Sequence, residues 1–266
     1  MSRASASALD AGGAGRRRLL AGGFGLACHG TFLVAIAVMF LGLGSGLATG
    51  LGRLDGPQAL TANALLALQF PLLHSALLTC RGRALLCRAG GRRHGQALAP
   101  TTYAWIAALQ ILATFTLWSP SGTTWWEPRG AALVVQHAVN ACAWLFLGKA
   151  LLDGGLGLQT GWIGWTAVWR GRRVQYPPLA QSGLFAVCRQ PIYLGFALTL
   201  WTGPRWTPDH ALLATVWSAY CLLGPVHKER RYRARHGEAF ELYRSRVPYM
   251  LPLPRRAAAR EAEEAA

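Results

Sequence analysis

Charged residues are scarce in this chain of 266 residues, and acidic residues are the scarcest. Only 14% of the residues are charged whereas 52% are hydrophobic, and 11 Asp and Glu stand against 27 Lys and Arg. A soluble domain usually has about 25% charged residues. The composition therefore excludes an ordinary soluble domain, and the length leaves room for one domain or two small ones.

Several motifs that would indicate other chemistries are also missing. The six cysteines form no Cys-x-x-Cys pair, so neither a disulfide framework nor a zinc site is indicated. The sequence has no Gly-x-Gly-x-x-Gly loop, no Walker lysine motif, no His-Glu-x-x-His helix and no internal repeat. These motifs mark dinucleotide, nucleotide and zinc-protease sites. We therefore expect no metal site and no soluble dinucleotide-binding fold.

Long apolar runs are what the chain does contain. Each run has about 20 residues, which is the length a helix needs to cross a bilayer. The runs predict an all-α fold, a polytopic integral membrane bundle of about six transmembrane helices. The expected limits of the helices are 19–42, 59–79, 101–118, 131–152, 184–203 and 210–226.

The basic residues are distributed unevenly between the two ends of these expected helices. The N-terminus, the loops after the second and fourth runs, and the C-terminal tail together contain 24 of the 27 Lys and Arg. The opposite side has only Arg53, Arg129 and Arg205. This asymmetry follows the positive-inside rule and predicts an integral protein of the bacterial inner membrane with both termini in the cytoplasm. The net charge of +16 then reflects topology, and the expected partners are membrane lipids and no nucleic acid.

The predicted domain organisation has three parts. Residues 1–18 are rich in Ala, Ser and Gly with a basic end, and we expect them to be disordered. Residues 19–254 form the membrane domain, in which the region 183–252 contains the polar residues of greatest interest. Residues 255–266 form a charged tail to which no function is assigned.

A polar stretch interrupts the fifth apolar run at residues 188–195, Cys-Arg-Gln-Pro-Ile-Tyr-Leu-Gly. The following helix returns Glu229 to the same side of the membrane. Together, Arg189 and Glu229 can hold a zwitterion, because a guanidinium pairs with a carboxylate and a carboxylate accepts from an ammonium or a hydroxyl. Alternatively, Arg189 reaches toward lipid phosphates while Glu229 pairs with Arg230, Arg233 or Arg235 on a solvated helix.

A histidine lies inside the second run, near its expected cytoplasmic end. His74 is followed by Ser75, and polar groups inside a membrane are costly unless they face the protein interior. His74 therefore either makes a hydrogen bond between helices or lines a substrate pocket.

Two motifs in the C-terminal third resemble those of a known enzyme superfamily. Residues 185–196 resemble the Arg-His-Pro-x-Tyr-x-Gly signature of the isoprenylcysteine carboxyl methyltransferase and phospholipid methyltransferase superfamily. Residues 229–252 resemble its closing motif, with His236-Gly237-Glu238, Tyr243, Arg246-Val247-Pro248 and Leu251-Pro252. Further features, in order, are most similar to the methanethiol S-methyltransferase branch: His74-Ser75, Thr102-Tyr103, Trp118-x-Pro120, Trp125-Trp126, Tyr176-Pro177-Pro178 and Trp201-x-x-Pro204.

The resemblance implies a membrane enzyme that transfers a methyl group from S-adenosylmethionine. The implied acceptor is a small thiol such as methanethiol, with an isoprenylated cysteine or a phospholipid as the alternative. The residues implied to bind the cofactor are Arg189, Gln190, Pro191, Tyr193, Gly195 and Glu229. The residues implied to be catalytic are Arg246, His74 and Tyr243. A thiol acceptor reacts as thiolate, so a cation or base beside it would help; His74, His227 and Arg246 are the candidates.

The sequence departs from the superfamily pattern at two positions. Gln190 stands where the signature has a histidine, and it can form hydrogen bonds but cannot carry a proton. Lys228 precedes Glu229 where the family has paired glutamates. This change favours an anionic acceptor or alters the affinity for the cofactor. The two departures leave a second hypothesis open, a non-catalytic membrane accessory protein that retains the fold.

Overall fold

The computed structural model of the chain describes residues 3–251, so Pro252 and the tail 255–266 lie outside the described residues. The described part is helical, apart from connecting segments and an isolated bridge between Trp126 and Trp206. Its helices are, in order, α1 (Arg3–Gly44), α2 (Gly56–Leu77), α3 (Cys80–Ala89), α4 (Gly95–Leu117), α5 (Ala131–Asp153), α6 (Leu156–Gln159), α7 (Trp162–Arg170), α8 (Leu184–Val187), α9 (Pro191–Trp201), α10 (Pro208–His236) and α11 (Glu238–Arg246).

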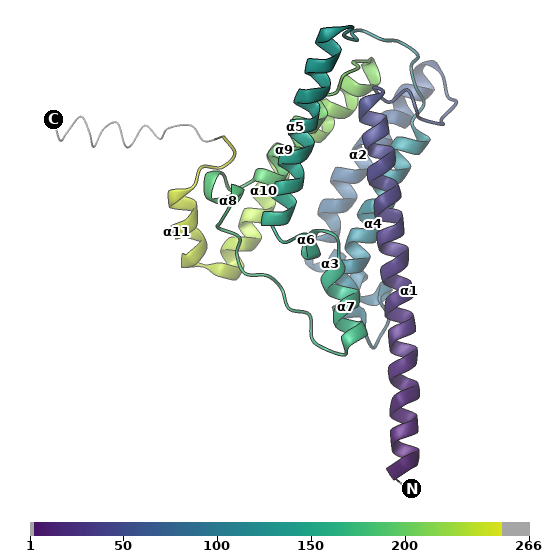
Figure 1. The fold of residues 1–266 in the computed structure, drawn as a ribbon, viewed down its shortest axis with the longest axis vertical. Coiled ribbons are helices and arrows are strands. Elements are labelled where there is room, and N and C mark those ends of the chain that lie inside the picture. Colours follow the sequence, from purple (N-terminus) through teal and green to yellow (C-terminus); the bar gives the residue numbers. More distant parts are fainter. Residues whose placement is uncertain (1–2, 252–266) are drawn as a thin grey trace, which may run out of the picture.

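The long helices α1, α2, α4, α5 and α10 run roughly along the long axis of the molecule, and the short helices α3, α6, α7, α8 and α11 lie toward its lower part (Figure 1). Helix α1 packs against α4, α4 against α2, and α2 against α10. Helix α9 lies between α10 and α5. The basic segments of α1, α3, α7 and α10 lie toward the lower end of the bundle in Figure 1, as the charge pattern predicted.

Four helices of the described residues are long and apolar enough to span a membrane. They are Gly13–Gly44, Gly56–Leu77, Gly95–Leu117 and Ala131–Asp153. Each coincides with one of the expected spans to within several residues. The prediction of an all-α membrane bundle is supported, whereas the prediction of six spans is not confirmed.

The fifth and sixth expected spans differ from the structure in informative ways. The run 184–203 is broken into α8 and α9 because Pro191 has no N–H to donate and disfavours helical geometry at Gln190. At 11 residues, α9 is too short to cross a bilayer alone. Helix α10 continues beyond the expected end at 226 to His236.

At the N-terminal end of the chain, residues 3–18 form the start of α1, whereas we expected this segment to be disordered.

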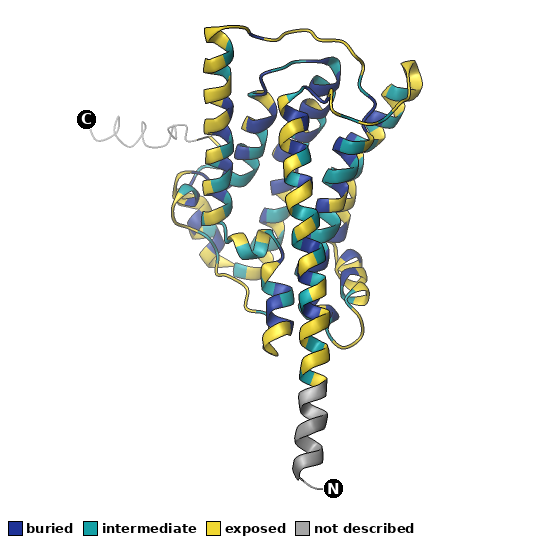
Figure 2. Ribbon diagram, turned by 45° about the vertical axis from the view of Figure 1, so that its right-hand side comes forward, coloured by how far each residue is buried: buried dark blue, intermediate teal, exposed yellow. Residues whose placement is uncertain are grey.

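Exposed residues recur along the long helices (Figure 2), and many of them are apolar. Leu33, Leu65, Val134 and Leu145 are all more than 60% exposed. Apolar patches of this extent are rare on soluble monomers and normal where a surface contacts lipid chains. The exterior therefore supports the assignment as a membrane protein.

A buried carboxylate holds together the end of the bundle opposite the basic segments. Asp209, near the start of α10, accepts from the indole of Trp118 at 3.0 Å and from the hydroxyl of Ser121 at 2.6 Å. The backbone N–H of Ser121 donates to the same carboxylate at 2.8 Å. These contacts join α10 to the segment after α4, because a buried carboxylate needs every available donor.

We expect Asp209→Asn to destabilise the protein, since the amide cannot accept from all three donors. Hydrogen bonds to a charged group contribute about 2 kcal/mol, so the apparent Tm should fall by about 4–8 °C. Thermal unfolding of the detergent-solubilised protein at a fixed scan rate measures the change. Glu127→Gln, on an exposed side chain at the same end, is the control and should leave Tm unchanged. An equal Tm for Asp209→Asn would show that the cluster does not stabilise the fold.

Candidate functional site

Arg189 is held in the break between α8 and α9, where it is 8% exposed. Its Nε donates to Glu229 Oε1 at 2.8 Å, and its Nη2 lies 3.4 Å from Glu229 Oε2. The pair joins the start of α9 to the C-terminal part of α10, where Glu229 lies. The alternative interpretation, in which Arg189 reaches toward lipid and Glu229 pairs with Arg230, Arg233 or Arg235, is therefore not supported. Among the described residues, these two side chains pair with each other.

The same guanidinium also binds the chain that follows α11. Arg189 Nη1 donates to the carbonyls of Val247 at 2.6 Å and Arg244 at 3.2 Å. Its backbone N–H, freed by the break in the helix, donates to the carbonyl of Pro248 at 2.9 Å. At least four of the five N–H groups of the guanidinium are thus engaged within the protein. Arg189 therefore connects α9, α10 and the chain that follows α11.

Gln190 connects Glu229 to Lys228. Its amide nitrogen donates to Glu229 Oε1 at 2.9 Å, and its amide oxygen accepts from Lys228 Nζ at 3.1 Å. Only one orientation of the amide satisfies both contacts, because a carboxylate accepts and an ammonium donates. The two positions that depart from the superfamily pattern therefore contact each other directly.

Tyr243 packs α11 against α8. Its hydroxyl donates to the carbonyl of Phe185 at 2.7 Å, and its side chain is buried together with Phe240. Burial raises the pKa of Tyr243, while the nearby Arg189 opposes this change. The hydroxyl consequently stays protonated and committed to a structural hydrogen bond.

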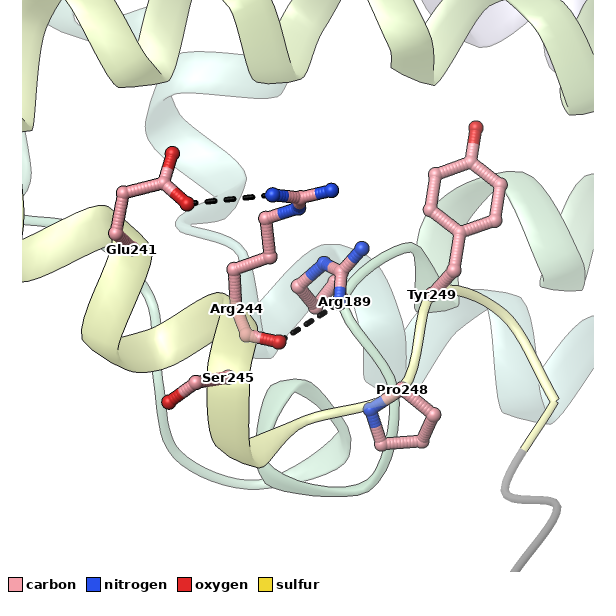
Figure 3. Close-up of a pocket in the computed structure, with 6 residues that line it drawn as sticks. All are labelled: Arg189, Glu241, Arg244, Ser245, Pro248 and Tyr249. Carbon is pink, nitrogen blue, oxygen red and sulfur yellow. Dashed lines mark hydrogen bonds and ion pairs between the residues drawn. The ribbon is translucent and has the colours of Figure 1, made fainter. Parts of the chain in front are cut away.

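Two adjoining pockets open beside the Arg189–Glu229 pair. One has a volume of about 470 Å³ and is lined by Arg189, Glu241, Arg244, Ser245, Pro248 and Tyr249. Figure 3 shows the Arg244 guanidinium between Glu241 and the ring of Tyr249. The other has a volume of about 430 Å³ and is lined by Arg189, Val226, Glu229, Arg230, Arg233, Arg244 and Tyr249. These volumes lie in the usual range for small-molecule sites.

A separate aromatic cluster lies inside the bundle around His74. The imidazole stacks on Phe70, with 4.8 Å between ring centroids, and lies 4.6 Å from Tyr103 of α4 and 6.2 Å from Tyr220 of α10. Its Nδ1 is buried without a hydrogen-bond partner among the described residues. Tyr193 of α9 lies 6.1 Å from Tyr220, which brings α9 to the same cluster.

The structure brings together only some of the residues that the sequence singled out. Arg189, Gln190 and Glu229 form one cluster, and Pro191 starts α9 directly beside it. Gly195 does not face this cluster: a Cβ there would lie 2.9 Å from the Cα of Leu147, so the glycine permits close packing of α9 on α5.

The three residues expected to be catalytic lie in different places. His74 belongs to the aromatic cluster, Tyr243 holds α11, and Arg246 is exposed outside the residues that line the two pockets. His227, a further candidate, is exposed on α10. Of these four residues, His74 is the one packed among aromatic rings inside the bundle.

Sequence reasoning included Val247 and Pro248 in the closing motif but missed Tyr249 and the aromatic surroundings of Lys228. Tyr249 lines both pockets, and its hydroxyl donates to the carbonyl of Leu222 at 2.8 Å. No local signal predicts this contact across 27 residues. For Lys228, one local signal existed: Tyr232 follows four residues later, so both side chains lie on the same face of the helix and can contact each other.

The chain was compared with known proteins. No family model and no solved structure matches it. It is 28% identical to methanethiol S-methyltransferase 2 of Bradyrhizobium diazoefficiens over 199 residues, which are 73% of this chain and 74% of that protein. It is 26% identical to a methanethiol S-methyltransferase of a Pseudomonas species, over 86% of this chain and 88% of that protein. It is 27% identical to that of Mycobacterium tuberculosis, over 75% and 80%.

The chain is related to proteins named methanethiol S-methyltransferase. This relationship supports the resemblance to that branch of the superfamily, which the motifs had indicated. Guanidinium and carboxylate groups both line the second pocket, from Arg230, Arg233 and Glu229. A zwitterionic ligand would find partners for both of its charges there.

We expect Arg189→Lys to loosen α11, because an ammonium cannot reproduce the contacts to Glu229 and to two carbonyls together. Losing one or two such bonds costs about 1.5–3 kcal/mol, so tryptic cleavage after Arg244 and Arg246 should become about tenfold faster or more. Limited proteolysis followed by mass spectrometry measures the rate. Arg205→Lys, at the other end of the bundle, is the matched control. An unchanged rate would mean that other contacts hold α11.

Proposed function

We propose that this protein is a membrane methyltransferase that moves a methyl group from S-adenosylmethionine to a small thiol. The observation that carries the proposal is the coincidence of two independent features. The chain is related over most of its length to proteins named methanethiol S-methyltransferase, and its Arg189–Glu229 cluster borders two pockets of ligand size.

S-adenosylmethionine supplies an electrophilic methyl group on a sulfonium, together with a carboxylate, an ammonium and ribose hydroxyls that the protein must bind. Arg230 is the residue best placed for the carboxylate, since it lines the second pocket and is exposed. Glu229 would accept from the ammonium, with its Oε2 less engaged than its Oε1. In this proposal Arg189, which the resemblance implied to bind the cofactor, acts through Glu229 by holding its orientation.

Methyl transfer is an in-line displacement, so the protein contributes mainly alignment and the exclusion of water. The aromatic cluster around His74 and Tyr193 offers a low-dielectric interior for the acceptor. Ring centroids only 4.6–6.2 Å apart leave little space between these side chains. Such a closely packed interior favours a small thiol over an isoprenylated cysteine or a phospholipid.

A non-catalytic accessory role is the second candidate, and one observation favours it. Arg189 and Glu229 pair with each other, and Gln190 cannot carry a proton. A protein that kept the fold for structural reasons alone would bind no methyl donor or would bind it without turnover.

We also propose that the membrane is the bacterial inner membrane and that both termini face the cytoplasm. The support is that the basic segments gather at the end of the bundle that includes the N-terminus and α11 (Figure 1). Arginines at that end would contact the anionic lipids of the cytoplasmic leaflet, and basic segments tend to stay in the cytoplasm.

Calorimetric titration with S-adenosylmethionine tests the cofactor site. We expect the detergent-solubilised wild type to bind, and Glu229→Gln and Arg230→Gln to bind about ten- to a hundredfold more weakly, since each loses a charge-assisted hydrogen bond. Arg129→Gln, on an exposed residue at the opposite end, is the control.

Gas chromatography of dimethyl sulfide formed from methanethiol then tests turnover. Absence of binding by well-folded wild type would contradict the methyltransferase function. Binding without formation of dimethyl sulfide, or of any methylated thiol or lipid, would support the accessory role instead.

A further inference from the structure

Lys228 precedes Glu229 on α10 but contacts a different set of neighbours. Its Nζ lies 5.6 Å from the ring centroid of Phe185, 5.7 Å from that of Tyr193 and 5.3 Å from that of Tyr232. Aromatic rings within about 6 Å attract a cation through their faces. The amine of Lys228 therefore lies in an aromatic niche formed by α8, α9 and α10.

One hydrogen bond connects this niche to the Arg189–Glu229 cluster. Lys228 Nζ donates to Gln190 Oε1 at 3.1 Å, its one hydrogen bond to the described residues. An ammonium has three N–H groups, so two of them have no hydrogen-bond acceptor among the described residues. Because Gln190 also donates to Glu229, the amine is one residue away from the place proposed for the methyl donor.

Burial makes the ammonium form of Lys228 easier to deprotonate than that of an exposed lysine. Burial lowers the pKa of Lys228 to about 8, the Glu229 carboxylate opposes this change, and the Arg231 guanidinium adds to it. The other titratable groups around it are Cys188, Tyr193 and Tyr232. A cationic methyl donor bound nearby would lower the pKa further. A proton-accepting fraction of the amine is therefore present at neutral pH.

The neighbouring groups are less suited to accept a proton. Gln190 has no titratable proton, and Arg231 remains charged at every relevant pH. Glu229 already accepts from Arg189 and Gln190. These constraints leave the amine of Lys228 as the available base beside the cluster.

We propose that Lys228 is the proton acceptor for the thiol, an inference that rests on the thiol methyltransferase function proposed above. A thiol becomes a strong nucleophile only as thiolate. The proton of the thiol passes to the neutral amine, and the thiolate sulfur forms a bond to the methyl carbon. The bond from that carbon to the sulfonium sulfur breaks, and its electron pair stays on the donor's sulfur, which becomes a neutral thioether. The ammonium then returns its proton to water.

The test compares wild type with Lys228→Met and Lys228→Arg in the full-length, detergent-solubilised protein with S-adenosylmethionine and methanethiol. Methionine removes the amine, whereas arginine keeps the positive charge but cannot release a proton. We expect both variants to bind S-adenosylmethionine and to lose about a hundredfold in kcat at neutral pH. The neutral amine is the active form, so wild-type kcat should rise as pH rises through about 8, and both variants should lose this rise.

A second readout does not depend on turnover. Lys149 and Lys228 are the two lysines of the chain, so competitive acetylation with acetic anhydride, quantified by peptide mass spectrometry, follows each amine separately. The exposed Lys149 is the internal standard, and Lys149→Met is the control variant for turnover. We expect Lys228 to reach half of its full reactivity near pH 8, and at lower pH when S-adenosylmethionine is bound.

Each outcome separates this inference from the proposed function. A wild type that methylates no thiol would overturn the proposed function itself. Wild-type turnover that Lys228→Arg retains, with the same pH profile, would overturn only the role of Lys228 as a base. Half-reactivity of Lys228 above about pH 10, the range of an ordinary lysine, would overturn it as well. Loss of S-adenosylmethionine binding in Lys228→Met would assign the residue to the donor site and equally overturn its role as base.

Discussion

The buried ion pair between Arg189 and Glu229 is the contact on which the basic end of this protein depends. Two charges removed from water are stable only if further hydrogen bonds satisfy their remaining donors and acceptors. Here Gln190 and the carbonyls of Arg244 and Val247 supply those bonds. The pair therefore joins the start of α9, the end of α10 and the chain after α11. Removing either partner would leave an uncompensated charge, at a cost of about 3–5 kcal/mol.

The same pair explains why α9 is short. An uninterrupted helix over 184–203 would use the backbone N–H of Arg189 within the helix, and it could not then donate to the carbonyl of Pro248. Pro191 forces the interruption and supplies the first turn of α9, where its missing N–H is not needed. The polar break lies beyond the apolar part of the bundle. It can exist in a membrane protein because its backbone groups are bonded to other parts of the chain.

These relations also show how far the sequence could predict the structure. The helices α1, α2, α4 and α5 were located from the length of their apolar runs, since that signal is local. Pro191 is a local signal for the break at 188–190, whereas the carbonyls that bind Arg189 there lie about 58 residues away, and no local pattern predicts them. The pairing of Arg189 with Glu229 was expected only as two groups on the same side of the membrane. Gly195 could serve a ligand or a helix, and only the position of Leu147 on α5 decided between them.

The two departures from the superfamily pattern compensate for each other. With Lys228 in place of a carboxylate, the residue at position 190 must accept from an ammonium while donating to Glu229. A glutamine amide does both at once and at every pH, because its oxygen only accepts and its nitrogen only donates. An imidazole can do both only when it is neutral, because the protonated ring has two donors and no acceptor. Gln190 and Lys228 are therefore one unit in hydrogen-bonding terms. Gln190 cannot carry a proton, but Lys228, which donates a hydrogen bond to it, can.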